Sequence, residues 1–267
     1  MPSPTTWLQL PAEDLPPIAA ARPDPEALAR ACDVLRRAVG TSESLSWPDL
    51  PAQSPYFFVH VFLGVLPDIR AWHSAHRVPE DVSRATLSDL GAKLTAHRIT
   101  HGTGGLDEQD WLVRHFSGTL YRLGRLQFER TQYAGQPVLD LHVPGDGPLD
   151  PTACDESLAA AKPFFARHFA RQLTPDQAVC RSWLLDEQLA EYLPADCNIV
   201  RFQRRFTLEP AIDDADGDGD ILQSVFGHRL PDLDSLPQVT RLQRAIVGHL
   251  REGRHWRLRI GRLQLPA

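Results

Sequence analysis

The chain has 267 residues and a formal net charge of −6, from 34 acidic and 28 basic side chains. Apolar residues make up 42% of it and charged residues 23%, a balance typical of a globular protein with a sizeable core. This composition excludes a disordered chain, and it lacks the strong basic excess of a dedicated nucleic-acid-binding protein.

No membrane or targeting segment is expected. The longest apolar stretch, 56–66, contains His60 and is too short to span a bilayer. The first ten residues, MPSPTTWLQL, lack a basic segment followed by an apolar run, so we expect no signal peptide. The four cysteines are scattered without a CxxC motif, which favours a reduced, cytoplasmic protein with no disulfide frame and no zinc cluster.

The first part of the chain is predicted to be helical after an irregular, Pro-rich lead-in over 1–23. Asp24 is a suitable N-cap for a helix that begins at Pro25 and stops at Gly40. The spacing of apolar residues predicts further helices over 56–75, 79–101 and 107–117.

After residue 115 the pattern changes to short alternating segments. Strands are predicted over 120–130, 138–143, 178–185, 199–208 and 255–265, with helices over 150–167, 187–193 and 241–252. We therefore expect a helical domain over 1–115 and a mixed α/β (α+β) sheet domain over 116–267.

Two heptapeptides resemble each other within the second half. RLGRLQF (122–128) and RIGRLQL (259–265) share five of seven residues, and no wider repeat accompanies them. Two strands of similar design are the preferred explanation.

The segment 138–167 combines a strand, a loop with Gly145 and Gly147, and a helix. Helix N-termini offer unpaired amides, and glycine lets a phosphate approach the backbone, so this segment is a candidate pyrophosphate cradle. It is neither the Rossmann glycine pattern nor a Walker A loop, and an ordinary Gly/Pro turn is the alternative.

The order of these elements resembles the core of GNAT-type N-acyltransferases. LYRLGRLQFER, KPFFARHF, SWLLDEQLAEYLP and NIVRFQRRFTL resemble the C-terminal domain of actinobacterial acyltransferase domain-containing proteins, and RATLSDLGAKLTAHRITHGTGGLD resembles their helical N-terminal domain. The resemblance covers roughly residues 55–265, and it implies a GNAT-like sheet domain with acyl-CoA or acetyl-CoA as co-substrate and no metal.

In GNAT folds the strand before the phosphate loop separates from its neighbour and pairs with the pantetheine arm. The resemblance therefore implies that Leu141, His142 and Val143 line the arm and that Gly145 and Gly147 meet the pyrophosphate. The usual loop begins with Arg or Gln where this chain has His142, and Asp146 adds negative charge beside the expected phosphates.

Attack of an amine on a thioester needs a base for the amine proton and an acid for the leaving thiolate. Tyr192 follows the third strand, where GNAT enzymes often place that acid, and a core aromatic is the alternative. Glu129 and His142 are candidate bases, each with a structural alternative.

The acceptor pocket has four candidate residues. Ser182 and Trp183 end the third strand, and Arg201 and Arg205 are predicted to share one face of the fourth. Those arginines could bind a carboxylate or a CoA phosphate, or they could form an ordinary ion-paired strand face.

Two possible metal motifs are judged to be decoys. DDADGDGD (213–220) begins like an EF-hand loop, but position twelve is Val225 instead of glutamate. His97 and His101 are four residues apart on a predicted helix, with no HExxH glutamate and no obvious third ligand.

The sequence therefore predicts a cytoplasmic two-domain enzyme that moves an acyl group from acyl-CoA to an amine of a small molecule or peptide. The alternative hypothesis is a GNAT-like domain that has lost catalysis and binds a ligand or a protein. Neither hypothesis involves nucleic acid or a membrane.

Overall fold

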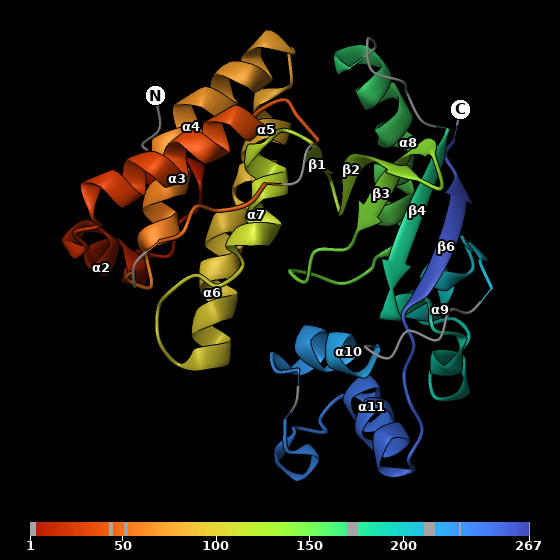
Figure 1. Ribbon diagram of the computed structural model, residues 1–267. Helices are drawn as coiled ribbons and strands as arrows, with labels where there is room; N and C mark the ends of the chain where they lie inside the picture. The colour runs from red at the N-terminus through yellow and green to blue at the C-terminus, as the bar shows by residue number, and fades with distance from the viewer. Residues whose placement is uncertain are drawn as a thin grey trace. The chain divides into compact units, whose positions relative to one another are not determined.

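A computed structural model describes residues 4–42, 45–50, 53–169, 176–210, 217–229 and 231–266. The chain forms two compact units, the first mainly helical and the second containing the long strands (Figure 1). The first unit comprises Met1–Leu123, Gln127–Thr131 and Phe165–Gln172, and the second comprises Gly124–Leu126, Gln132–Phe164 and Leu173–Ala267.

The helices of the first unit enclose an apolar core. They are α1 (Pro4–Trp7), α2 (Leu15–Ala20), α3 (Pro25–Ala38), α4 (Phe57–Ala75), α5 (Glu80–Leu87), α6 (Asp89–His101) and α7 (Gln109–Phe116), with a 3-10 turn η1 (Ala12–Asp14) and strand β1 (Leu120–Leu123). The predicted irregular lead-in is wrong, because α1, η1 and α2 form within it and Trp7 and Leu8 are buried in the core.

Capping explains two of these helix boundaries. The Asp24 carboxylate accepts a hydrogen bond of 2.7 Å from the Ala27 amide, as the sequence predicts for the start of α3. The single helix predicted over 79–101 is instead two helices that meet at Ser88, whose hydroxyl donates to the Ala85 carbonyl.

The remaining elements complete a six-stranded sheet in the order β1-β2-β3-β4-β6-β5. They are β2 (Leu126–Tyr133), β3 (Gln136–His142), α8 (Pro151–His168), β4 (Gln177–Ser182), η2 (Trp183–Leu185), η3 (Glu187–Glu191), α9 (Asn198–Gln203), β5 (Thr207–Leu208), α10 (Gly217–Phe226), η4 (Leu233–Ser235), α11 (Arg241–Arg251) and β6 (Arg259–Gln264).

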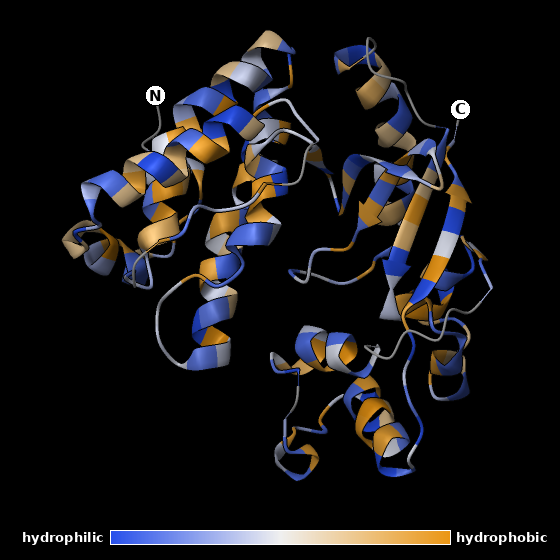
Figure 2. Ribbon diagram, viewed as in Figure 1, coloured by the Kyte–Doolittle hydropathy of each residue, from blue (hydrophilic) through white to orange (hydrophobic). Residues whose placement is uncertain are grey.

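Strands β4 and β6 of the second unit form a ladder of six register pairs. They are antiparallel and paired from Gln177↔Gln264 to Ser182↔Arg259, and they lie side by side in Figure 1. Hydrophobic, hydrophilic and near-neutral residues follow one another along β6, as Figure 2 shows. β6 also pairs with the short β5, through Leu208↔Gly261.

Three predictions about the second half need correction. The predicted strand over 199–208 is wrong, because most of this segment forms α9 and its end forms the two-residue strand β5. The Gln203 side chain anchors the end of α9 by donating to the carbonyls of Leu184 (2.8 Å) and Asp186 (2.9 Å). The heptapeptide 122–128 is not one strand, since its glycine forms the turn between β1 and β2. Of the predicted loop 213–220, residues 213–216 lie outside the described residues and the rest begins α10.

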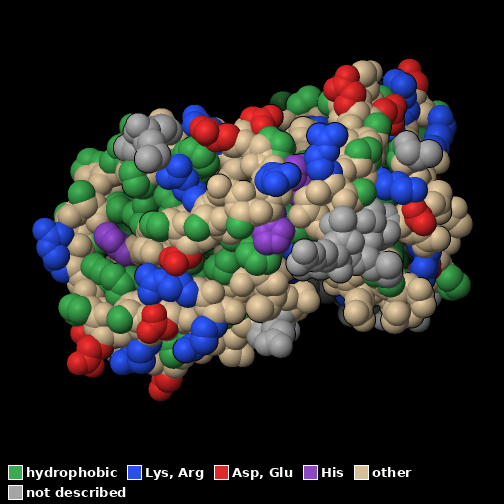
Figure 3. Space-filling model, turned by 90° about the horizontal axis from the view of Figure 1, so that it is seen from above, with side chains coloured by type: hydrophobic (Ala, Val, Ile, Leu, Met, Phe, Trp, Pro, Cys, Tyr) green, Lys and Arg blue, Asp and Glu red, His purple; other side chains and the backbone are tan. Residues whose placement is uncertain are grey.

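No helix among the described residues has both the length and the apolar content to cross a bilayer. In each unit, the face shown in Figure 3 has Lys and Arg side chains interspersed with Asp and Glu.

Candidate active site

The register pairs between β3 and β4 end before the carboxyl end of either strand. These parallel strands pair at Leu139↔Ala178 and Asp140↔Val179, and no further register pair occurs between them among the described residues. β3 nevertheless continues to His142, and β4 stays paired with β6 as far as Ser182. The register pairing of β3 with β4 therefore ends before Leu141 and His142, and this end of the two strands is called the seam.

An arginine holds the loop that follows β3. The Arg125 guanidinium, in the turn between β1 and β2, donates to the carbonyls of Pro144 (2.8 Å), Gly147 (2.6 Å) and Pro148 (2.8 Å). Because Arg125 binds the carbonyl oxygens of the loop, it fixes the loop backbone without occupying the loop's amide N–H groups. Sequence reasoning missed this residue, since its partners lie about twenty positions away along the chain.

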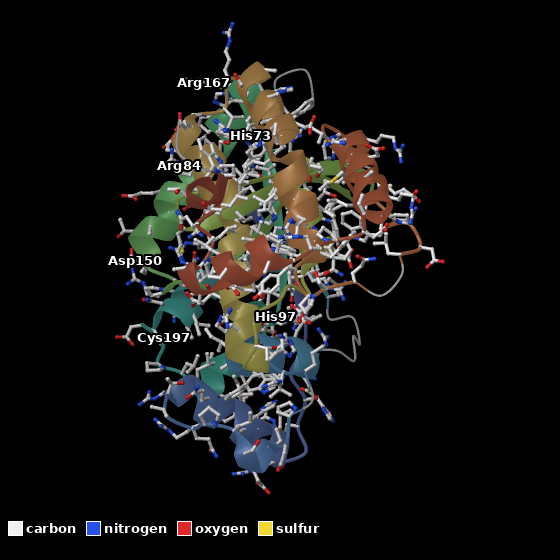
Figure 4. The ribbon with its side chains drawn as sticks, turned by 90° about the vertical axis from the view of Figure 1, so that its left-hand side faces the viewer. His73, Arg84, His97, Asp150, Arg167 and Cys197 are labelled. Atoms are coloured by element: carbon white, nitrogen blue, oxygen red, sulfur yellow. The ribbon has the colours of Figure 1, made fainter. Side chains whose placement is uncertain are left out.

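The two loop glycines face open space. A Cβ atom added to Gly145 or Gly147 would meet nothing within 4 Å, so the loop's own packing does not demand glycine there. The end of α8 is already capped, because the Asp150 carboxylate accepts a 2.9 Å hydrogen bond from the Ala153 amide. Asp150 is labelled at the start of this helix in Figure 4. An anion near this loop would therefore meet the loop amides, since a carboxylate occupies the helix end.

Tyr192 lies directly after η3 and its hydroxyl has two nitrogen partners. The hydroxyl lies 2.9 Å from His249 Nδ1, on α11, and it accepts a 3.0 Å hydrogen bond from Arg254 Nη1. Arg254 is in turn held by both carboxylate oxygens of Glu191 (2.8 and 3.0 Å). His249 is fully buried and stacks on Trp256 at 4.0 Å between ring centroids.

The surroundings of Tyr192 keep its proton in place. Partial burial raises the pKa of the Tyr192 hydroxyl, and the positive charge of Arg254 opposes that shift. An open depression of about 360 Å³ borders the residue, lined by Tyr192, Arg241, Arg244 and Ala245. The sequence indicated Tyr192 but neither His249 nor Arg254; a histidine on the buried face of an amphipathic helix was the available signal.

The two candidate bases have different partners. His142 ends β3 at the seam, half-buried, with its Nε2 3.6 Å from a carboxylate oxygen of Asp140. Glu129 belongs to the first unit and accepts a 2.9 Å hydrogen bond from Arg114. Glu129 therefore already forms an ion pair, whereas His142 lies at the carboxyl end of β3.

The other predicted residues are dispersed through the second unit. Ser182 ends β4 and accepts a hydrogen bond from the Leu184 amide, and Trp183 is buried in η2. Arg201 is exposed on α9 and not on a strand face. Arg205 follows that helix, donates to Asp155 (2.7 and 2.9 Å) and so braces the first turns of α8. Leu141 is buried, and Val143 begins the loop.

Two family models divide the chain between them. Residues 2–118 match the N-acyltransferase N-terminal domain, and residues 120–263 match the GNAT-like C-terminal domain. The chain belongs to the GNAT-like N-acyltransferases. No curated protein matches it.

Solved acyltransferases resemble this GNAT-like N-acyltransferase over nearly its whole length. An acyltransferase in complex with CoA and 10C-teicoplanin is 41% identical, with a TM-score of 0.92, over 98% of this chain and 86% of that one. An acyltransferase with decanoyl-CoA and teicoplanin has 41% identity and a TM-score of 0.93, with the same coverage. A mutant acyltransferase in complex with octanoyl-CoA has 40% identity and a TM-score of 0.91, again over 98% and 86% of the two chains.

Proposed function

We propose that this enzyme transfers a medium-length acyl chain from acyl-CoA to an amine on a glycosylated peptide or a similar small molecule. The observation that carries the proposal is the seam between β3 and β4, where pairing stops after Asp140↔Val179. Structures of similar sequence bind decanoyl-CoA, octanoyl-CoA and teicoplanin, which supports both the donor and the acceptor class.

The donor would complete the sheet. The amide-rich pantetheine arm would lie in the seam beside Leu141, His142 and Val143, beyond the last β3–β4 register pair at Asp140↔Val179. The pyrophosphate would then meet Gly145 and Gly147 in the loop whose Pro144, Gly147 and Pro148 carbonyls accept hydrogen bonds from Arg125. Arg125 thus offsets part of the negative charge that Asp146 contributes to the loop.

Tyr192 would be the acid. Nε2 of His249 is buried without a described partner, and a buried N–H without an acceptor is rarer than a buried lone pair. We therefore assign the proton of His249 to Nδ1, which donates to the Tyr192 oxygen together with Arg254. With both lone pairs of that oxygen used, the hydroxyl proton is free to point away from these two residues.

The proton transfers then balance. The amine nitrogen forms a bond to the thioester carbonyl carbon while His142 accepts the proton that the amine loses. The C–S bond breaks, and the leaving thiolate takes the Tyr192 proton, which gives an amide and free CoA. His249 and Arg254 donate to the phenolate left behind, and His142 returns its proton through solvent to restore the enzyme.

Acyl transfer through Cys154 or Cys180 is disfavoured. Burial raises the pKa of the Cys154 and Cys180 thiols, so neither is a ready thiolate. The four cysteines are all unpaired, which supports our proposal of a reducing, cytoplasmic compartment.

Calorimetry and mass spectrometry test this function. We expect the enzyme to bind decanoyl-CoA and octanoyl-CoA, and to add one acyl group to a glycopeptide that carries an amino sugar. Tyr192→Phe should lower kcat by about 100-fold, in the usual range for a general acid. Tyr133→Phe is the matched control, because its hydroxyl is bound to Glu209 in another part of the unit.

The outcomes distinguish a failure of acyl-CoA binding from a failure of the role assigned to Tyr192. Absence of binding by any acyl-CoA would overturn the enzyme hypothesis in favour of a ligand-binding or interaction module. Full turnover by Tyr192→Phe would leave the acyl transfer standing and reject Tyr192 as the acid.

A further inference from the structure

The last turn of α6 and the loop after it bring together two imidazoles and a carboxylate. His97 and His101 lie four residues apart on α6, and Asp107 follows a glycine-rich loop. One ligand atom from each of the three residues lies within 4.8 Å of the other two. All three belong to the first unit, and Figure 4 labels His97 on this helix.

The hydrogen bond of His97 favours the tautomer that can bind a metal through Nε2. Its Nδ1 lies 3.0 Å from the carbonyl oxygen of Thr103, which can only accept a hydrogen bond. The proton of the neutral ring is therefore on Nδ1, and Nε2 keeps its lone pair. Metal-bound histidines commonly donate their second N–H to a carbonyl in this way, which fixes the ring orientation.

His101 and Asp107 supply the second and third ligands. His101 Nε2 lies 2.9 Å from Asp107 Oδ2, and the two histidine rings are 4.4 Å apart between centroids. A cation would take the position of the proton shared by the imidazole and the carboxylate. Both side chains are about half exposed, so they can close on an ion without rearranging the core.

The backbone fixes the carboxylate opposite the helix. Gly102 ends α6 with a positive φ of 69°, and the Leu106 amide donates to the Pro55 carbonyl at 3.0 Å. Gly105 packs directly on His97, because an added Cβ would lie 2.7 Å from the imidazole Cε1. The adjacent cation, Arg98, is paired with Asp14 and so is neutralised.

We propose that His97, His101 and Asp107 bind a divalent transition-metal ion such as Zn²⁺. Two imidazoles and one carboxylate suit Zn²⁺, Co²⁺ or Ni²⁺, whereas Mg²⁺ and Ca²⁺ prefer oxygen ligands alone. Water completes the coordination. The ion fastens the end of α6 to the loop 102–107, and it takes no part in acyl transfer.

Titration of the tag-free, metal-stripped protein with ZnCl₂ tests the site. We expect one equivalent of Zn²⁺ to bind, Co²⁺ to give a d–d absorption band, and zinc to raise the Tm. His97→Gln, His101→Gln and Asp107→Asn should each weaken zinc binding by more than tenfold, since even partners outside the ligand shell cost 10 to 100-fold. Affinity should also fall in acid, because protons compete for the nitrogen ligands.

His255→Gln is the matched control. His255 Nδ1 lies 2.7 Å from Asp218, which forms an exposed His–Asp pair with no third ligand identified among the described residues. This variant should bind zinc like the unaltered protein. The proposal fails if the unaltered protein binds no stoichiometric zinc, if Asp107→Asn and His97→Gln keep full affinity, or if His255→Gln abolishes binding. Circular dichroism confirms that each variant is folded.

Discussion

The heptapeptides 122–128 and 259–265 have five residues in common and adopt different structures. In the first, Gly124 has a φ of 69° and forms the turn between β1 and β2. In the second, Gly261 lies within β6, and an added Cβ would come within 2.8 Å of Phe206. One glycine is required by backbone conformation and the other by packing, so the same residue serves two physical needs.

The other matched positions diverge in the same way. Arg125 holds the loop after β3, whereas Arg262 pairs with Glu209 at 2.5 Å. Gln127 is buried, and Gln264 is exposed at the end of β6. Sequence identity over seven residues therefore does not determine environment, and substitutions at matched positions measure the difference.

The largest effects on stability are expected at the two glycines. Gly261→Ala should destabilise the protein by about 1–3 kcal/mol through overpacking, and Gly124→Ala by about 1–2 kcal/mol through left-handed backbone strain. Asparagine tolerates a positive φ, so Gly124→Asn should recover part of the loss while Gly261→Asn should not. Urea unfolding measures all four variants; equal costs for Asn at both positions would contradict the distinction.

The next prediction compares the stability cost of replacing Gln127 with that of replacing Gln264. Gln127 Nε2 donates to the buried Asp89 carboxylate at 3.3 Å and lies 3.3 Å from His115 Nε2. Gln127→Leu leaves these groups less satisfied and should cost about 1–3 kcal/mol in unfolding free energy. Gln264→Leu removes one exposed hydrogen bond to the Asp176 carbonyl and should change stability by less than about 0.5 kcal/mol. A Gln264 effect as large as that of Gln127 would reject this difference in environment.

Substitutions of Arg125 and Arg262 should affect acyl-CoA binding differently. Arg125→Met should raise the Kd for acyl-CoA by about tenfold, or ~1.4 kcal/mol, because the loop loses its three carbonyl contacts. Arg262→Met should leave that Kd unchanged. Calorimetry with decanoyl-CoA compares the two variants, and an unchanged Kd in Arg125→Met would remove the loop from the donor site.

The smallest effect concerns acid stability at the second heptapeptide. Hydrogen bonds from Tyr133 and then Arg262 lower the pKa of Glu209 below its usual range. Its stabilising contribution is present above the unfolded pKa and is lost as the pH falls through the folded pKa. Arg262→Met should therefore flatten the decline of Tm in acid slightly, whereas Arg125→Met should keep the slope attributable to Glu209.

The sequence predicts regular, locally determined elements well. Asp24 caps α3 by its side chain as predicted, and this signal lies three residues from the amide that it binds. The segment 199–208 was mispredicted because its alternation of apolar and basic residues is typical of a strand. Contacts from Gln203 to η2 and the residue after it hold α9 in place, and these long-range contacts have no local signal.

The candidate site shows the same limit. Tyr192 and the loop glycines were accessible through resemblance to a family, whereas Arg125, His249 and Arg254 act through partners about 20 to 60 residues away. Asp107 is a similar case, because no helical spacing relates a residue beyond a glycine loop to His97 and His101.

The short pairing of β3 with β4 has a consequence for amide hydrogen exchange. Backbone amides in the β4–β6 ladder are protected by continuous pairing, whereas the register pairs of β3 with β4 end at Asp140↔Val179, so β3 amides that face β4 beyond Asp140 should exchange earlier. A bound pantetheine arm would supply the missing acceptors and slow exchange at these positions alone. Deuterium uptake at the end of β3 would thus report how much of the enzyme has bound acyl-CoA, without any measurement of catalytic turnover.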